Sequence, residues 1–166
     1  MTEIEGLLRA LRGEEVELIV VGGVAATIYG SARLTQDLDV VYRRTPGNLA
    51  RLAAALEPHA PYLRGAPPGL PFLWDARTLR SGLNFTLTTA LGAIDLLGEI
   101  AGGGAYEDLL PYSRPVSAFG VEFLCLGLRR LIQVKRAAGR PKDLEAISEL
   151  EALLAEREAL TPGDPG

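Results

Sequence analysis

Cysteine and histidine are almost missing from this chain of 166 residues, which has one of each, Cys125 and His59. A disulfide within the chain is therefore impossible, and a zinc site built from cysteine and histidine is nearly so. Catalysis by a Ser–His or Cys–His pair would have to use His59. That residue lies between Pro58 and Pro61, in a stretch typical of a loop rather than of a rigid support for a catalytic base.

Lysine is also scarce, with Lys135 and Lys142 the only two, and the net charge is −4. A broad basic surface that binds nucleic acid nonspecifically is therefore not expected. A local basic groove remains open, because five arginines are close enough in the sequence to supply one: Arg33, Arg43, Arg44, Arg77 and Arg80. The alternative is that each of them is a solvated surface charge.

Long apolar runs are absent as well. The longest, Leu18 to Gly30, is too short and too rich in glycine to span about 30 Å of hydrocarbon. The segment Met1 to Glu15 mixes charges with leucines and has no apolar core of a signal peptide. We therefore expect a cytoplasmic protein that does not engage a membrane.

The pattern of apolar residues, which make up 48% of the chain, predicts an α/β (α+β) fold. Strands are expected over residues 16–21, 37–42, 83–88, 93–97, 116–118 and 121–124, and helices over 3–11, 24–29, 46–57, 127–138 and 141–158. The Pro- and Gly-rich segment 58–82 should be a long excursion with one short strand or turn near Phe72–Trp74. We expect a mixed sheet flanked by helices over 1–125, a C-terminal helical hairpin over 126–158 packed on it within one domain, and a flexible tail over 159–166.

Two carboxylates open the second strand, Asp37 and Asp39. Residues i and i+2 of a strand share a face, with Cα atoms about 6.6 Å apart, so both carboxylates can converge on a divalent cation. Upstream, the first strand runs into Gly22-Gly23, where the lack of Cβ atoms lets a phosphate approach the backbone. Each feature alone is ambiguous: glycines often end strands, and acids at a strand's end are commonly solvated.

Asp95 strengthens this interpretation, because it lies within the apolar run Gly92 to Leu97. A carboxylate there costs several kcal/mol unless it meets a cation or a hydrogen-bond partner. Three carboxylates on adjacent strands would share divalent metal, which suits the transfer of a phosphate-bearing group. Asp95 could also take the proton from an attacking hydroxyl.

Two charged residues near the C-terminus lie on apolar helix faces, Lys135 and Asp143. One explanation is a buried ion pair, Lys135–Asp143 or Arg140–Asp143, that orients the two helices. The other is that Lys135 reaches an anion such as a triphosphate while Asp143 positions it. Both can hold together.

With these residues in this order, the chain resembles the nucleotidyltransferase superfamily, which has the fold of DNA polymerase β and of the antibiotic nucleotidyltransferases. The family pattern is a strand, Gly-Gly or Gly-Ser, a spacer, Asp-x-Asp and a later strand with a third acid. Gly22-Gly23, Asp37-Leu38-Asp39 and Ile94-Asp95-Leu96 match it in order and approximate spacing. Gly-Gly replaces the commoner Gly-Ser, so the contact of a serine hydroxyl with phosphate is missing.

Within the superfamily, two further motifs are similar to small bacterial proteins akin to the toxin of the AbiE abortive-infection system. One is Gly-Gly-x-Ala followed by Gly30, Arg33, Thr35 and Asp37. The other is the stretch Lys135 to Asp143, which is similar to that group's Lys-x-x-x-x-Arg-x-x-Asp signature.

The resemblance implies metal-dependent transfer of a nucleoside monophosphate from an NTP to an acceptor hydroxyl. It implies catalytic and metal-binding roles for Asp37, Asp39 and Asp95 with Mg²⁺ (or Mn²⁺), nucleotide binding by Gly22, Gly23, Arg33 and Lys135, and supporting roles for Thr35, Arg140 and Asp143. The implied acceptor is RNA, such as a tRNA end, with a cognate antitoxin protein as partner. The alternatives are a non-catalytic antitoxin or protein-binding partner with the same fold, and a transferase acting on an aminoglycoside-like small molecule.

Overall fold

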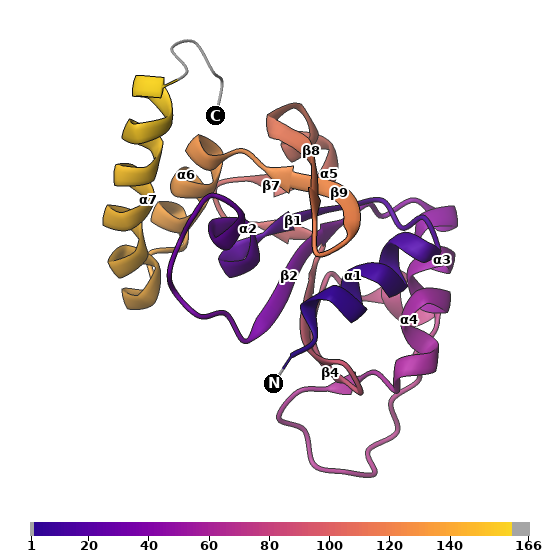
Figure 1. The fold of residues 1–166 in the computed structure, drawn as a ribbon. Coiled ribbons are helices and arrows are strands. Elements are labelled where there is room, and N and C mark those ends of the chain that lie inside the picture. The colour runs from indigo at the N-terminus through magenta and orange to yellow at the C-terminus, as the bar shows by residue number, and fades with distance from the viewer. Residues whose placement is uncertain (1, 161–166) are drawn as a thin grey trace.

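A mixed β-sheet runs through the centre of the molecule, which the computed structural model describes over residues 2–160 (Figure 1). Its seven strands follow the order β3-β4-β5-β2-β1-β9-β8. Their bounds are β1 Leu18–Val21, β2 Asp37–Tyr42, β3 Tyr62–Leu63, β4 Asn84–Thr89, β5 Gly92–Leu97, β8 Ser113–Ala118 and β9 Val121–Leu126. Strand β2 pairs antiparallel with β1 and parallel with β5, so the centre of the sheet joins segments far apart in the sequence.

Helices cover the sheet in two groups. Helices α1 (Ile4–Gly13), α3 (Pro46–Leu56) and α4 (Ala76–Ser81) gather on one side, as Figure 1 shows. Helices α2 (Gly22–Ile28), α6 (Leu128–Ala138) and α7 (Pro141–Leu160) lie on the other, where α6 packs against both α2 and α7. No helix within residues 2–160 is both long and apolar enough to cross a membrane.

The alternation of residues in β2 assigns its two faces. Leu38, Val40 and Tyr42 are completely buried and belong to the main apolar core. Asp37 and Asp39 alternate with them and are only half-buried. Because side chains alternate between the faces of a strand, burial of the apolar set presents both acids to the opposite face.

Local signals in the sequence set several helix ends. Thr45 accepts a hydrogen bond from the Asn48 backbone N–H at 3.4 Å, and Pro46 occupies the first turn of α3. Gly139 ends α6 in the left-handed conformation, at φ 66°. Asn48 itself is fully buried, and its side-chain amide donates to the carbonyls of Glu17 and Arg43, which holds α3 against the ends of β1 and β2.

The predicted fold class, a mixed sheet flanked by helices, is confirmed. The prediction of a short strand or turn near Phe72–Trp74 is wrong: residues 72–74 form neither, and Trp74 donates its indole N–H to the carbonyl of Ala53 in α3. The segment 58–82 contains β3 and α4. A small hairpin of β6 (Glu99–Ile100) and β7 (Gly104–Ala105), followed by α5 (Tyr106–Leu109), was not predicted. Two short 3-10 helices, Glu57–His59 and Leu110–Tyr112, were not predicted either.

The expected C-terminal hairpin corresponds to α6 and α7, which pack against each other. Helix α7 extends to Leu160, so residues 159 and 160 are helical rather than part of a tail. The remainder of the expected flexible tail lies outside the described residues.

Candidate active site

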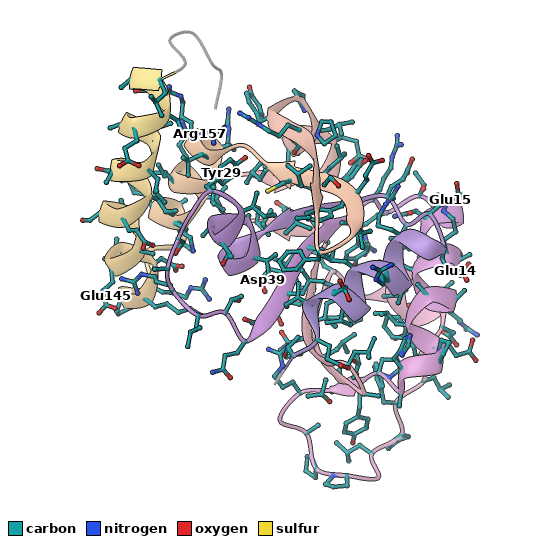
Figure 2. All side chains as sticks on the ribbon, in the orientation of Figure 1. Glu14, Glu15, Tyr29, Asp39, Glu145 and Arg157 are labelled. Atoms are coloured by element: carbon teal, nitrogen blue, oxygen red, sulfur yellow. The ribbon has the colours of Figure 1, made fainter. Side chains whose placement is uncertain are left out.

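Three carboxylates meet on the face of the sheet that carries α2, α6 and α7. Asp39 of β2 and Asp95 of β5 are register partners on adjacent parallel strands, and Asp37 lies two residues before Asp39 on the same face. One oxygen from each of these three side chains lies within 4.8 Å of the others. Figure 2 shows Asp39 on β2, beside α2. The sequence predicted that these three acids would come together, and the pairing of β2 with β5 brings them together.

Without a bound cation, the carboxylates of the cluster repel one another when they are ionised. Burial, reinforced by the charges of Asp37 and Asp95, raises the pKa of Asp39 to about 8. Burial and the charge of Asp95 likewise raise the pKa of Asp37. Like charges this close cannot all ionise cheaply, so the group holds a proton that separate carboxylates would have lost.

The donor set suits a hard divalent cation. Within the described part of the chain, Asp39 Oδ1 is buried and has no hydrogen-bond partner. A buried carboxylate oxygen left in that state is costly unless a cation binds it. Carboxylate oxygens are the ligands that Mg²⁺ and Mn²⁺ favour, and a charge of +2 would offset the repulsion within the cluster. The three side chains therefore fit such an ion.

Two glycines bring the backbone against this cluster. Gly22 has φ +66°, and a Cβ atom added to it would lie 2.1 Å from Asp39 Oδ2. A Cβ atom on Gly23 would lie 2.7 Å from the hydroxyl of Thr35. Any side chain at either position would thus displace a neighbour, and at Gly22 it would also strain the backbone. The Gly-Gly pair is required by this close approach.

A cationic cavity opens beside the glycines and the acids. It has a volume of about 360 Å³ and lies between α2, the 31–36 connection and the α6–α7 junction. The cavity is named here for the four basic side chains in its wall, Arg33, Lys135, Arg140 and Lys142. The wall also carries four acids, Asp37, Asp39, Asp143 and Glu149. If a divalent cation offset the charges of Asp37 and Asp39, the four basic side chains would outnumber Asp143 and Glu149, which would suit a polyphosphate.

An ion-pair network links α6 to α7 at this cavity. The Asp143 side chain, only 3% exposed, lies 2.6 Å from Arg140 Nε and 3.9 Å from Lys135 Nζ. Burial alone would raise the pKa of Asp143, but hydrogen bonding and charge from Arg140 outweigh it and lower the pKa. Burial also lowers the pKa of Lys135, against the pull of Asp143. Both ion pairs considered from the sequence are present, and Lys135 still lines the cavity.

The remaining predicted residues divide between the cavity and other surfaces. Thr35 donates its hydroxyl to the carbonyl of Asp37, and Arg33 donates to the carbonyl of Glu145 in α7. Arg43, by contrast, follows the far end of β2 and pairs with Glu17 and Glu107. The five arginines considered for one basic groove are therefore not gathered into one.

Arg64 contacts the acid cluster, although no pattern in the sequence indicated this. Its Nη2 atom lies 2.9 Å from Asp95 Oδ1, and its Nη1 atom lies 3.8 Å from Asp37 Oδ2. It follows the two-residue strand β3, whose length leaves no periodic signal in the sequence. No local pattern in the excursion 58–82 could have marked it.

A second cavity, of about 270 Å³, lies on the side of Asp95 toward α6. Its wall is mixed: apolar side chains such as Leu97, Ile100, Leu131 and Val134 stand beside polar and charged ones such as Asn84. The acid cluster stands between the two cavities, which share Gly22, Asp39, Lys135, Arg140 and Asp143.

Among solved structures, the chain is similar to the crystal structure of a "putative nucleotidyltransferase" from Thermotoga maritima, with a TM-score of 0.54 and 18% identity over 91% of this chain and 89% of that one. At this identity the likeness shows the fold alone. No protein-family model matches the chain, and no curated protein matches it significantly.

Proposed function

We propose that this protein is a metal-dependent nucleotidyltransferase, which moves a nucleoside monophosphate from an NTP to an acceptor hydroxyl and releases pyrophosphate. The observation that carries the proposal is the convergence of Asp37, Asp39 and Asp95, with one oxygen of each within 4.8 Å of the others. Beside them lies the Gly22-Gly23 pair, where any side chain would clash with a neighbour. The fold shared with the Thermotoga maritima protein supports the same class.

The three aspartates would hold Mg²⁺ or Mn²⁺. When bound, the metal would act as a Lewis acid toward the phosphate oxygens of the substrate. The buried, unpartnered Oδ1 of Asp39 supports its assignment as a ligand. Burial, together with the charges of the neighbouring acids, raises the pKa values of Asp37 and Asp39, and a bound cation would offset both effects.

The NTP would bind with its phosphates in the cationic cavity. Gly22 and Gly23 would let the phosphates approach the backbone, while Arg33 and Lys135 would neutralise the charge that develops on the leaving pyrophosphate. Arg140 and Asp143 would fix the position of Lys135 through the network described above. The Thr35 hydroxyl lies where a side chain at position 23 would stand, so it could replace the serine hydroxyl common in the family.

In the chemical step, the acceptor oxygen would form a bond to the α-phosphorus as the bond from that phosphorus to the β-bridging oxygen breaks. Pyrophosphate leaves with that electron pair. Asp95 would accept the hydroxyl proton, because it is the acid of the cluster on the second strand and borders the second cavity.

The resemblance to the AbiE group favours RNA, such as a tRNA end, as the acceptor, within a toxin–antitoxin pair. An NTP labelled at the α-phosphate, incubated with Mg²⁺ and either total RNA or aminoglycosides, tests both the activity and the acceptor class. We expect label to enter RNA, and to be lost in the Asp37→Asn/Asp39→Asn double variant but not in Glu156→Gln, a control acid exposed on α7. NTP binding by the wild-type protein without label transfer to either acceptor would instead favour a non-catalytic binding protein.

A further inference from the structure

Arg64 ends a row of residues that crosses the sheet on the face of the acids. Val21 pairs with Asp39, Asp39 with Asp95, and Asp95 with Thr86 on β4. The Arg64 backbone N–H then donates to the carbonyl of Thr86 at 3.0 Å. The glycine turn and its cationic cavity thus adjoin one end of the row, and Arg64 stands at the other.

The guanidinium of Arg64 is fixed by the sheet. Its Nε and Nη2 atoms donate to the carbonyl of Leu87 at 3.2 and 2.8 Å, and Nη2 also donates to the carbonyl of Ile94 at 3.1 Å. Within residues 2–160, Nη1 makes no hydrogen bond and has only the longer ion-pair contact with Asp37. The side chain as a whole remains 29% exposed.

The surface next to Arg64 is open and polar. On β4, Asn84, Thr86 and Thr88 are exposed, while Phe85 and Leu87 between them are buried. Side chains of this kind donate and accept hydrogen bonds, as sugar and phosphate groups require. The acid face of β4 is therefore a polar platform that leads to the acid cluster.

The chemistry of transfer places the acceptor on this platform. Attacking and leaving oxygens lie roughly in line across the phosphorus. If pyrophosphate leaves into the cationic cavity, the acceptor arrives from the opposite end of the row. We infer that Arg64 binds a backbone phosphate of the acceptor through Nη1, and that the acceptor is the hydroxyl-bearing end of a nucleic-acid strand.

Charge favours this class over the small-molecule one. A divalent cation on the acid cluster would offset two of its three negative charges, so the Arg64 guanidinium would face less anionic charge there. A phosphodiester would supply an anionic oxygen to Nη1, because Nε and Nη2 already donate to the carbonyls of Leu87 and Ile94. An aminoglycoside-like acceptor is itself cationic and would be repelled. This inference rests on the proposed function and names its acceptor class.

The salt dependence of RNA binding tests the inference directly. The probe is a short, fluorescein-labelled single-stranded RNA with a free 3′-hydroxyl, titrated in Mg²⁺ without NTP and followed by fluorescence anisotropy over roughly 50 to 200 mM salt. Loss of one phosphate contact should lower the magnitude of the log–log slope by about 0.7 in Arg64→Gln and weaken binding roughly tenfold. Arg77→Gln removes an exposed charge from the same segment and should leave the slope nearly unchanged.

Two further measurements separate the possible failures. Arg64→Lys keeps the charge and should retain the slope, although it loses the carbonyl contacts, and thermal unfolding checks that each variant is folded. Mg·NTP affinity, measured by calorimetry, should not fall in Arg64→Gln, because the lost guanidinium lies beside the acids that would hold the metal and does not line the cationic cavity. An unchanged slope in folded Arg64→Gln overturns the inference while the proposed function stands, as does labelling of aminoglycosides instead of RNA. Absence of Mg·NTP binding in the wild-type protein overturns both.

Discussion

Replacing Asp39 by asparagine should stabilise the protein in the absence of metal. The pKa of Asp39 is raised from an ordinary value of 3.8 to about 8, chiefly by burial. Between these values the folded state binds a proton that the unfolded state lacks. The free energy of unfolding must therefore fall as pH rises through this window, by at most about 1.4 kcal/mol per pH unit for one group.

Asparagine has nearly the same shape and cannot ionise, so the variant should lose most of this slope. Because Asp37 and Asp95 share the titration, only part of the full shift belongs to Asp39. We expect Asp39→Asn to be more stable than wild type by about 1–3 kcal/mol near pH 8, and the difference to shrink toward pH 5. Urea unfolding in EDTA at several pH values measures it.

Addition of Mg²⁺ should reverse the order of stability. A ligand that binds only the folded state at about a hundred times its Kd adds about 2.7 kcal/mol. Wild type should gain this increment, whereas Asp39→Asn should gain little, and the exposed control Glu156→Gln should behave as wild type. A wild-type protein whose stability in EDTA rises between about pH 5 and pH 8, or a variant stabilised equally by Mg²⁺, would refute the reasoning.

Three other substitutions give distinct outcomes. Gly22→Ala should lower the free energy of unfolding by about 1–3 kcal/mol and abolish stabilisation by Mg²⁺, because its Cβ would clash with Asp39. The control in the same urea experiment is Gly13→Ala, where an added Cβ meets no atom within 4 Å. Lys135→Met should weaken Mg·NTP binding roughly 10- to 100-fold by calorimetry, since a charged contact is lost. Arg140→Gln should lower the free energy of unfolding by about 1–3 kcal/mol near neutral pH, because it leaves Asp143 poorly paired. Much of the difference from wild type should disappear as pH falls and Asp143 protonates, and a difference that stays constant across pH would contradict the prediction.

Local sequence signals predicted the elements whose residues carry a strong pattern. The bounds of β2 were predicted as Asp37–Tyr42, and the start of α3 followed from Thr45-Pro46. Strands of two residues, such as β3, have no alternation to detect. The start of α4 did carry a readable signal, because Asp75 accepts a hydrogen bond from the Thr78 backbone N–H at 2.7 Å as a helix cap does.

The acid cluster could be predicted because Asp37 and Asp39 open a strand at i, i+2 spacing and Asp95 lies within an apolar strand, where a carboxylate is costly without a partner. Arg64 could not, because its position depends on β3 joining the edge of the sheet beside β4. Tertiary pairing of this kind lies beyond any window of local sequence. The same limit applies to the β6–β7 hairpin, which pairs through only two residues on each strand.

Trp74 is the sole tryptophan, and its indole is anchored on α3, away from the acid cluster. The fluorescence of Trp74 should therefore report whether segment 58–82 detaches from α3, and not whether a nucleotide is bound. In a denaturant titration, a red shift of the Trp74 emission maximum at lower denaturant than the loss of far-ultraviolet ellipticity would mean that this segment dissociates from α3 before the sheet unfolds.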